Sequence, residues 1–320
     1  MKHIALFLFV AFSAMNITSD ISAQTICENG FAGEYACDGY DLYTYFPLSS
    51  VGGGDNGNDC WGWVDSESGR EFVLFGRSDG MSVVEITDPL APSFIANLPT
   101  ATYPSLWRDI KVIGDYAFIG SEAGMHGMQI LDLTQVLDLS GFPFNITATS
   151  NYLGFGNAHN LAANPETNYV YGVGTNTFGG GLHIVDVSNP EAPFLAGSYD
   201  GAYSHDVQPV IYNGLDADYQ GQEIVFCFNG QNGLAIVNAE DKSDVYLIKA
   251  ITYEDGFYTH QGWLSEDHHM LYFNDELDET NNGNNTRTYM MNVDDLDNPV
   301  IVGFYEAENT AIDHNLYTHN

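Results

Sequence analysis

A unit of about 50 residues that repeats along the chain is the feature that most restricts its fold. In each unit a glycine opens a short apolar stretch, which ends in an acidic or amide residue and often in proline. The clearest copies occupy residues 80–89 and 181–190, and weaker copies occupy residues 127–134, 233–238 and 288–293. Each copy is typical of a strand that is entered through glycine and left through a turn.

A second pair of short strands is indicated between successive copies, for example at residues 109–112 and 116–120. No segment shows a sustained helical period, and turn residues recur at short, regular intervals. Four short strands per unit are the sequence signature of a propeller blade, whereas a flat sandwich would not repeat so regularly. We therefore predict an all-β fold, a β-propeller of four-stranded blades.

One position recurs at the start of each unit and sets the number of blades. Its occupants, in chain order, are Trp61, Arg108, His159, His205, His260 and His314. These starts predict a six-bladed propeller. Only the first strand of the last unit precedes Asn320, so we expect the last blade to be truncated in this chain.

The N-terminus predicts export. A basic start, an apolar run over residues 4–14 and small residues up to Ala23 form a secretory signal. We therefore predict a signal peptide over residues 1–23, an N-terminal segment over 24–59 and the propeller over 60–320. The apolar run is too short to span a bilayer, and no later stretch reaches ~20 apolar residues, so we expect no transmembrane segment. The predicted location is extracellular or at the cell surface.

Export permits disulfides. Cys27 and Cys37 lie in a glycine-rich segment with little apolar periodicity, so we predict that they are bonded to each other. Cys60 and Cys227 lie in or beside strand-like segments, where buried free thiols and a second bridge fit equally well.

Charge restricts the partners. The formal net charge of −35 repels phosphate backbones and anionic lipid heads, which argues against nucleic acid and membrane-surface partners. The same charge concentrates cations near the protein, although a solvated acidic surface that maintains solubility explains it as well.

Several long motifs occur in one order along the chain. They are Cys27–Gly33, Trp61–Trp63, Leu106–Asp109, Gly156–Asn160, Tyr203–Asp206, Thr259–Trp263, Asp275–Glu279 and Asp313–Tyr317. With these motifs the repeats resemble the LVIVD propeller repeat, and the chain from Cys27 onward resembles the choice-of-anchor B family of secreted bacterial proteins. The resemblance implies a propeller joined to a C-terminal surface anchor, which we expect beyond Asn320. It implies no reaction and assigns no catalytic residue.

The recurring histidines are the strongest chemical signal. Equivalent positions in successive blades converge on the central axis, and imidazole is a common ligand of transition metals. We therefore predict that these four side chains, assisted by Asp109 or Asp206, hold a ligand or a divalent cation such as zinc or calcium. The alternative is structural: each histidine hydrogen-bonds the neighbouring blade and faces away from the axis.

An acidic loop is the second candidate site. Asp275, Glu276, Asp278 and Glu279 lie within five residues, and four asparagines follow them. Hard cations such as Ca²⁺ take oxygen ligands of this kind, but the order is not that of an EF-hand. A solvated acidic loop is the alternative.

Three functions fit these observations. The first is a binding module that presents its loops to an extracellular protein or carbohydrate. The second is a metal-dependent hydrolase that uses the propeller channel, an interpretation that rests on analogy between folds. The third is a structural spacer before an anchor. The sequence has no nucleophile elbow, zincin, P-loop or dinucleotide motif, which favours a protein that is not an enzyme.

Overall fold

A computed structural model describes residues 24–139 and 143–319, so the predicted signal peptide lies outside the described residues. The chain forms two compact units. Within the described residues, the smaller unit comprises residues 24–45 together with Asp88–Pro92, and the larger unit comprises Phe46–Thr87 and residues 93–139 and 143–319. No helix of the described residues is long and apolar enough to cross a membrane.

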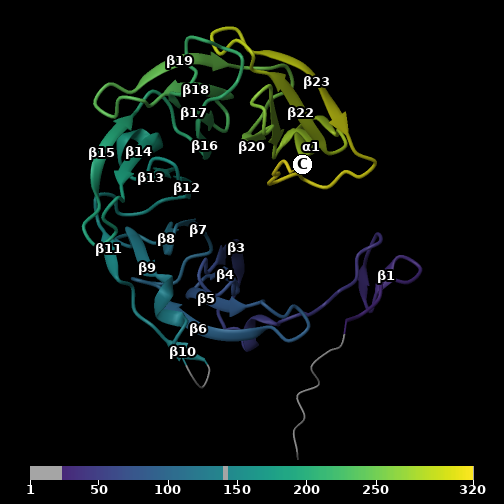
Figure 1. The fold of residues 1–320 in the computed structure, drawn as a ribbon. Helices are drawn as coiled ribbons and strands as arrows, with labels where there is room; N and C mark the ends of the chain where they lie inside the picture. The colour runs from purple at the N-terminus through teal and green to yellow at the C-terminus, as the bar shows by residue number, and fades with distance from the viewer. Residues whose placement is uncertain (1–23, 140–142, 320) are drawn as a thin grey trace, which may run out of the picture. The chain divides into compact units, whose positions relative to one another are not determined.

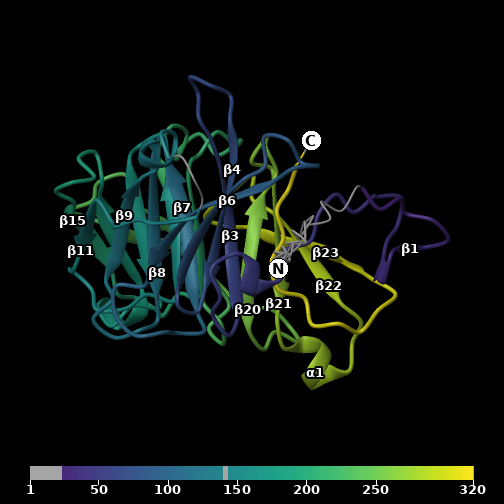
Figure 2. The ribbon, with the colours of Figure 1, turned by 90° about the horizontal axis from the view of Figure 1, so that it is seen from below.

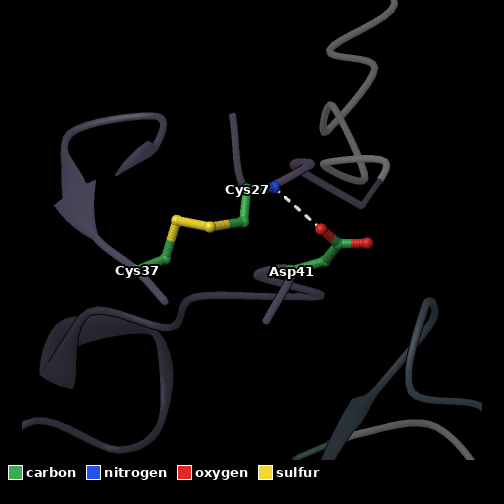
Figure 3. Close-up of a disulfide and its surroundings, with 3 residues drawn as sticks. All are labelled: Cys27, Cys37 and Asp41. Carbon is green, nitrogen blue, oxygen red and sulfur yellow. Dashed lines mark hydrogen bonds between the residues drawn. A yellow bond between two sulfur atoms is a disulfide. The ribbon is translucent and has the colours of Figure 1, made fainter. Parts of the chain in front are cut away.

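The smaller unit has one short sheet, in which β1 (Phe31–Ala32) pairs antiparallel with β2 (Tyr35–Ala36). The Cys27–Cys37 disulfide closes this segment, with 6.0 Å between the two Cα atoms (Figure 3). The backbone N–H of Cys27 donates to Asp41 Oδ1 at 2.7 Å. Few side chains of this segment are buried, so the covalent bridge takes the place of a hydrophobic core.

The larger unit consists of antiparallel sheets that follow one another about a common axis (Figures 1 and 2). The first sheet runs from the axis outward as β3 (Gly57–Val64), β4 (Glu71–Arg77), β5 (Gly80–Glu85) and β6 (Ser93–Pro99), and β10 (Phe144–Asn145) adds a parallel edge strand. The second contains β7 (Arg108–Ile113), β8 (Tyr116–Ser121), β9 (Met128–Asp132) and β11 (Ser150–Tyr152). The third contains β12 (Asn160–Asn164), β13 (Tyr169–Val173), β14 (Leu182–Asp186) and β15 (Phe194–Tyr199).

The fourth sheet contains β16 (Asp206–Ile211), β17 (Glu223–Phe228), β18 (Leu234–Asn238) and β19 (Tyr246–Ile251). The fifth contains β20 (Thr259–Leu264), β21 (Met270–Asp275), β22 (Arg287–Asn292) and β23 (Val300–Glu306). The helical segments are short: α1 (Asp278–Asn282) and the 3₁₀ turns Leu48–Ser50, Leu133–Val136 and Phe178–Gly180. The prediction of an all-β propeller with four-stranded blades is confirmed.

The core lies between successive sheets, which explains why the repeated strands are apolar on both faces. Leu74 and Val83 of the first sheet pack with Ile119 of the second, and equivalent clusters join each later pair of sheets. Burying one such side chain contributes roughly 1.5–3 kcal/mol. Each sheet therefore depends on its neighbours, and the inner strands β3, β7, β12, β16 and β20 are held side by side around the axis (Figure 1).

Polar side chains join the inner strands of neighbouring sheets at one recurring level. Asp59 Oδ2 accepts the backbone N–H of Ile110 at 2.8 Å, and one sheet further Asp109 Oδ2 accepts that of Leu161 at 2.5 Å. Asp59 therefore corresponds to Asp109, and its neighbour Asn58 occupies the recurring position that the sequence analysis gave to Trp61. Trp61 lies in the inner strand β3, as predicted, but after the recurring position, which Asn58 occupies.

The segment after β23 returns to the axis beside β20. Leu316 donates its backbone N–H to Gln261 Oε1 at 2.8 Å, and Thr318 Oγ1 donates to the carbonyl of Leu264 at 2.6 Å. The bond to Gln261 is of the same kind as those between the earlier inner strands. His314 is thereby held where the sequence repeat predicts the start of a sixth unit.

Candidate functional site

The four recurring histidines lie side by side. Ring centroids are 4.3 Å apart for His159 and His205, 4.2 Å for His205 and His260, and 4.1 Å for His260 and His314. These residues stand at the start of successive inner strands or, for His314, in the segment beside β20. The spacing of about 50 residues in sequence thus becomes a single row of imidazoles, which we call the imidazole row.

The imidazole row lines a cavity of about 680 Å³. Trp107 and Tyr258 line the same cavity. Trp107 directly precedes the inner strand β7, and Tyr258 directly precedes the inner strand β20. Arg108 fills the recurring position of the second sheet, but its guanidinium is buried. It donates to the carbonyl of Arg77 at 2.9 Å and to Thr100 Oγ1 at 2.8 Å. Arg108 therefore joins sheets and does not extend the row.

The first two imidazoles are already occupied by hydrogen bonds. His159 Nδ1 lies 2.6 Å from Glu122 Oε1, and the Nε2 atoms of His159 and His205 are 2.7 Å apart. His205 Nδ1 lies 3.2 Å from the carbonyl oxygen of His260. Three ring protons are needed to make all of these bonds with an ionised Glu122, and two neutral imidazoles supply only two. This series of hydrogen bonds therefore either holds one extra proton or lacks one of its bonds. In both cases the ring nitrogens of His159 and His205 are engaged, so these two residues are poorly placed as free metal ligands.

The third imidazole is different. Only 2% of His260 is exposed, and its Nδ1 atom has no hydrogen-bond partner. Burial, with the neighbouring imidazoles, lowers the pKa of His260 to about 2 and that of His205 to about 3. Burial disfavours a charged ring, and a second positive charge beside it would repel it. His260 is therefore neutral at ordinary pH and can donate a lone pair.

A carboxylate completes this part of the row. Glu276 Oε2 lies 3.9 Å from His260 Nε2, and ligand atoms of His260, Glu276 and His314 all lie within 4.8 Å of one another. Two such groups occur among the described residues, and the other, Asp216, Asp295 and Asp297, is acidic and largely at the surface. Two imidazoles and one carboxylate are a ligand set that zinc accepts.

The two aspartates predicted to assist the histidines belong to another group. Lys111 Nζ lies 2.5 Å from Asp109 Oδ1 and 3.9 Å from Asp59 Oδ2. Burial alone would lower the pKa of Lys111, but Asp109, Asp59 and Asp206 together raise it above its usual value. The structure thus gathers Asp109 and Asp206 around a buried ammonium, and neither joins a three-ligand group in the described part of the chain.

The predicted acidic loop separates into three environments. Asp275 accepts the backbone N–H groups of Phe257 at 2.7 Å and Tyr258 at 2.9 Å, so it holds the chain locally. Glu276 faces the imidazole row. Asp278 and Glu279 are buried in α1. The four residues therefore do not form one cation loop.

Sequence reasoning missed Glu122, and it placed Glu276 in the acidic loop without connecting it to the imidazole row. Glu122 follows β8 directly, and Glu276 follows β21 directly, so both occupy the end of a second strand. In a propeller that end returns to the same level as the start of the inner strand. The repeat therefore contained a signal for both residues, but it was read only for the histidines.

Comparisons with known proteins agree with this architecture. Residues 107–133 and 156–201 match a protein-family model described as the LVIVD repeat. A functionally unknown protein from Desulfotomaculum acetoxidans is 12% identical, with 77% of this chain and 69% of that chain covered and a TM-score of 0.51. A periplasmic gluconolactonase of Pseudomonas aeruginosa is 12% identical, with 79% and 72% covered and a TM-score of 0.52. No curated protein matches the chain in sequence. Likeness at this identity shows the propeller fold alone.

Proposed function

We propose that the chain is an exported binding module of the choice-of-anchor B type, and that its axial cavity holds a divalent transition metal such as zinc. The observation that carries the proposal is the group formed by the buried, neutral imidazole of His260, whose Nε2 atom faces Glu276, together with Glu276 and His314. The signal-like N-terminus and the LVIVD repeats support the exported, surface-associated part of the proposal.

The ligand distances support a small adjustment on binding. Ligand atoms around tetrahedral zinc lie about 3.3 Å apart when each is about 2.0–2.1 Å from the metal. The His260 and Glu276 atoms are 3.9 Å apart, and the ligand atoms of all three residues lie within 4.8 Å of one another, so side-chain movements of about 1 Å close the site. Because His260 is neutral, the metal does not have to displace a proton from it. The net charge of −35 also raises the local cation concentration.

The cavity supports binding of a further group at the metal. Its volume of about 680 Å³ falls in the range of small-molecule sites, which is roughly 300–1,000 Å³. Trp107 and Tyr258 supply aromatic surface, which suits a sugar ring or an aromatic side chain of a protein partner. Three protein ligands leave one tetrahedral position for that partner.

The test removes metal from the purified protein with a chelator and then measures zinc binding by titration calorimetry. We expect about one zinc ion per chain. His260→Gln and Glu276→Gln should each weaken binding at least about tenfold, since each removes one ligand. His269→Gln is the matched control, because His269 is partly exposed and its Nδ1 atom contacts Asp294 Oδ1, away from the imidazole row. Equal zinc affinity in the wild type and the His260→Gln variant would overturn the proposal.

An open metal position also favours a second candidate, metal-dependent hydrolysis, because bound water there becomes a nucleophile. The gluconolactonase with a similar fold makes a lactone the first substrate to try. Zinc-loaded wild type should then open gluconolactone faster than the His260→Gln variant. Equal rates in both proteins would rule out hydrolysis at this site, and only the binding-module proposal would remain.

A further inference from the structure

A second group of titratable side chains lies next to the imidazole row and plays no part in it. Five carboxylate oxygens are buried without any hydrogen-bond donor: Asp278 Oδ1, both oxygens of Glu279 and both oxygens of Asp313. Only 1% of Asp278 and 6% of Glu279 are exposed. We call these three residues the carboxylate cluster.

The three carboxylates repel one another, although their ligand atoms do not all lie within 4.8 Å of one another. Burial, then repulsion from Glu279 and Asp278, raises the pKa of Asp313 to about 8. Burial, with Asp278 as a neighbouring charge, raises the pKa of Glu279 to about 7. The cluster thus joins α1 of the fifth sheet to the segment that follows β23.

The neighbouring Asp275 shows what a structural carboxylate looks like in this fold. It accepts backbone N–H groups from Phe257 and Tyr258, and Tyr253 Oη donates to its Oδ2 at 2.8 Å. In the carboxylate cluster the comparable bond among the described residues is the one that Tyr289 Oη donates to Asp278 Oδ2 at 2.9 Å. Asp275 is therefore satisfied by the protein, and the cluster is not.

The cluster also has no cationic partner. No lysine or arginine forms an ion pair with Asp278, Glu279 or Asp313 among the described residues. Arg287, on the adjacent strand, is paired with Glu306 at 2.8 Å. Removing an ionised carboxylate from water costs several kcal/mol unless it is paired, and three together also repel one another. Protons or an external cation must therefore neutralise the cluster.

We propose that the carboxylate cluster is a site for a hard divalent cation, with Ca²⁺ as the best match. Ca²⁺ takes six to eight oxygen ligands in flexible geometry, and carboxylates supply several at once. Sharing one cation requires the three side chains to draw closer than they lie in the structure, which Ca²⁺ tolerates better than Mg²⁺.

This site is separate from the proposed zinc site, although Asp313 and His314 are adjacent in sequence. It uses oxygen ligands only, whereas the imidazole row offers nitrogen. The two sites are therefore expected to prefer different ions, and each can be tested while the other is left intact.

The experiment uses Tb³⁺ as a luminescent substitute for Ca²⁺, with excitation of the aromatic side chains. Tyr289, which is bonded to Asp278, is the nearest light-absorbing donor. We expect Tb³⁺ emission that Ca²⁺ displaces, and a melting temperature that rises with added Ca²⁺ in the wild type. Glu279→Gln and Asp313→Asn should each weaken Ca²⁺ binding about tenfold or more, because each removes one ligand charge.

Two controls separate this site from other acidic groups. Glu276→Gln should leave Ca²⁺ affinity unchanged while it weakens zinc binding, so failure of one site is distinguishable from failure of the other. Asp295→Asn alters the surface carboxylate group and should also have no effect. The proposal is overturned if Ca²⁺ leaves the melting temperature of the wild type unchanged. It is also overturned if Glu279→Gln and Asp313→Asn, shown by circular dichroism to be folded, bind Ca²⁺ like the wild type. Either result would mean that protons alone neutralise the cluster.

Discussion

The imidazole row and the carboxylate cluster meet at Asp313 and His314, and burial acts on them in opposite directions. It lowers the pKa of His260 to about 2 and raises the pKa of Asp313 to about 8. The physical cause is the same, because low polarity disfavours whichever form is charged. A neutral imidazole is ready to bind a metal, whereas a neutral carboxylic acid must first release a proton. Two adjacent residues thus end in sites that differ in ligand type and in proton demand.

Within the acidic loop, satisfied and unsatisfied carboxylates should respond oppositely to substitution. Asp275→Ala removes the acceptor of several buried donors and should lower the free energy of unfolding by about 3–5 kcal/mol. Glu279→Gln removes a charge that has no donor, so in chelator its stability should equal or exceed that of the wild type. Urea unfolding in chelator measures both. A larger loss for Glu279→Gln than for Asp275→Ala would mean that the cluster is structural.

The two proposed sites should also separate by ion. His260→Gln should weaken zinc binding at least about tenfold, or ~1.4 kcal/mol, and leave Ca²⁺ affinity within about twofold. Glu279→Gln should do the reverse. Calorimetric titration of both variants with zinc and with Ca²⁺ measures whether each variant loses affinity for one ion only. If either variant lost both ions equally, the row and the cluster would form one coupled site.

Much of this architecture follows from sequence, because a repeat encodes equivalence. The in-phase histidines predicted a convergent row, and the apolar strands predicted sheets covered on both faces. The count placed the first unit start at Trp61, which lies in the inner strand β3, whereas Asn58 occupies the recurring position. The repeat count also could not show that Asp109 pairs with Lys111 and does not assist the imidazole row. Repeats give the level of a residue along the axis, but a neighbouring charge decides which group it joins.

The carboxylates show a different limit. Glu276 and Glu279 lie in one acidic stretch, yet the structure directs one to the imidazole row and the other to Asp313. Composition predicted cation binding for the stretch as a whole. Only the turn after β21 and the short helix α1 decide which way each side chain points. Asp313 lies more than 30 residues away in sequence, so local pattern gave no reason to group it with them.

The opposite effects of burial on the pKa of a histidine and of a carboxylate can also be tested at residues that lie outside both proposed ion sites. Burial lowers the pKa of His183 to about 4, and only 1% of this residue is exposed. The unfolded chain, with a pKa near 6.5, binds a proton first, so the wild type loses stability as pH falls below about 6.5. His183→Gln lacks this titration. The difference in free energy of unfolding by which the variant is less stable than the wild type should therefore shrink by about 2 kcal/mol between pH 7.5 and pH 5. Urea unfolding at both pH values measures the change, and a constant deficit would contradict it.

Asp59 gives the same test with the sign reversed. Burial, then the charge of Asp109, raises its pKa to about 8. The folded protein holds this proton while the unfolded chain, with a pKa near 3.9, has released it. The wild type should therefore lose stability as pH rises from about 4 towards 8. Asp59→Asn cannot titrate and keeps an oxygen that can accept the N–H of Ile110. Its stability relative to the wild type should rise between pH 5 and pH 8. Unfolding curves of the two proteins in chelator would show this. A relative stability that stays constant from pH 5 to pH 8 would mean that Lys111 keeps Asp59 ionised, and that burial does not dominate at this end of the axis.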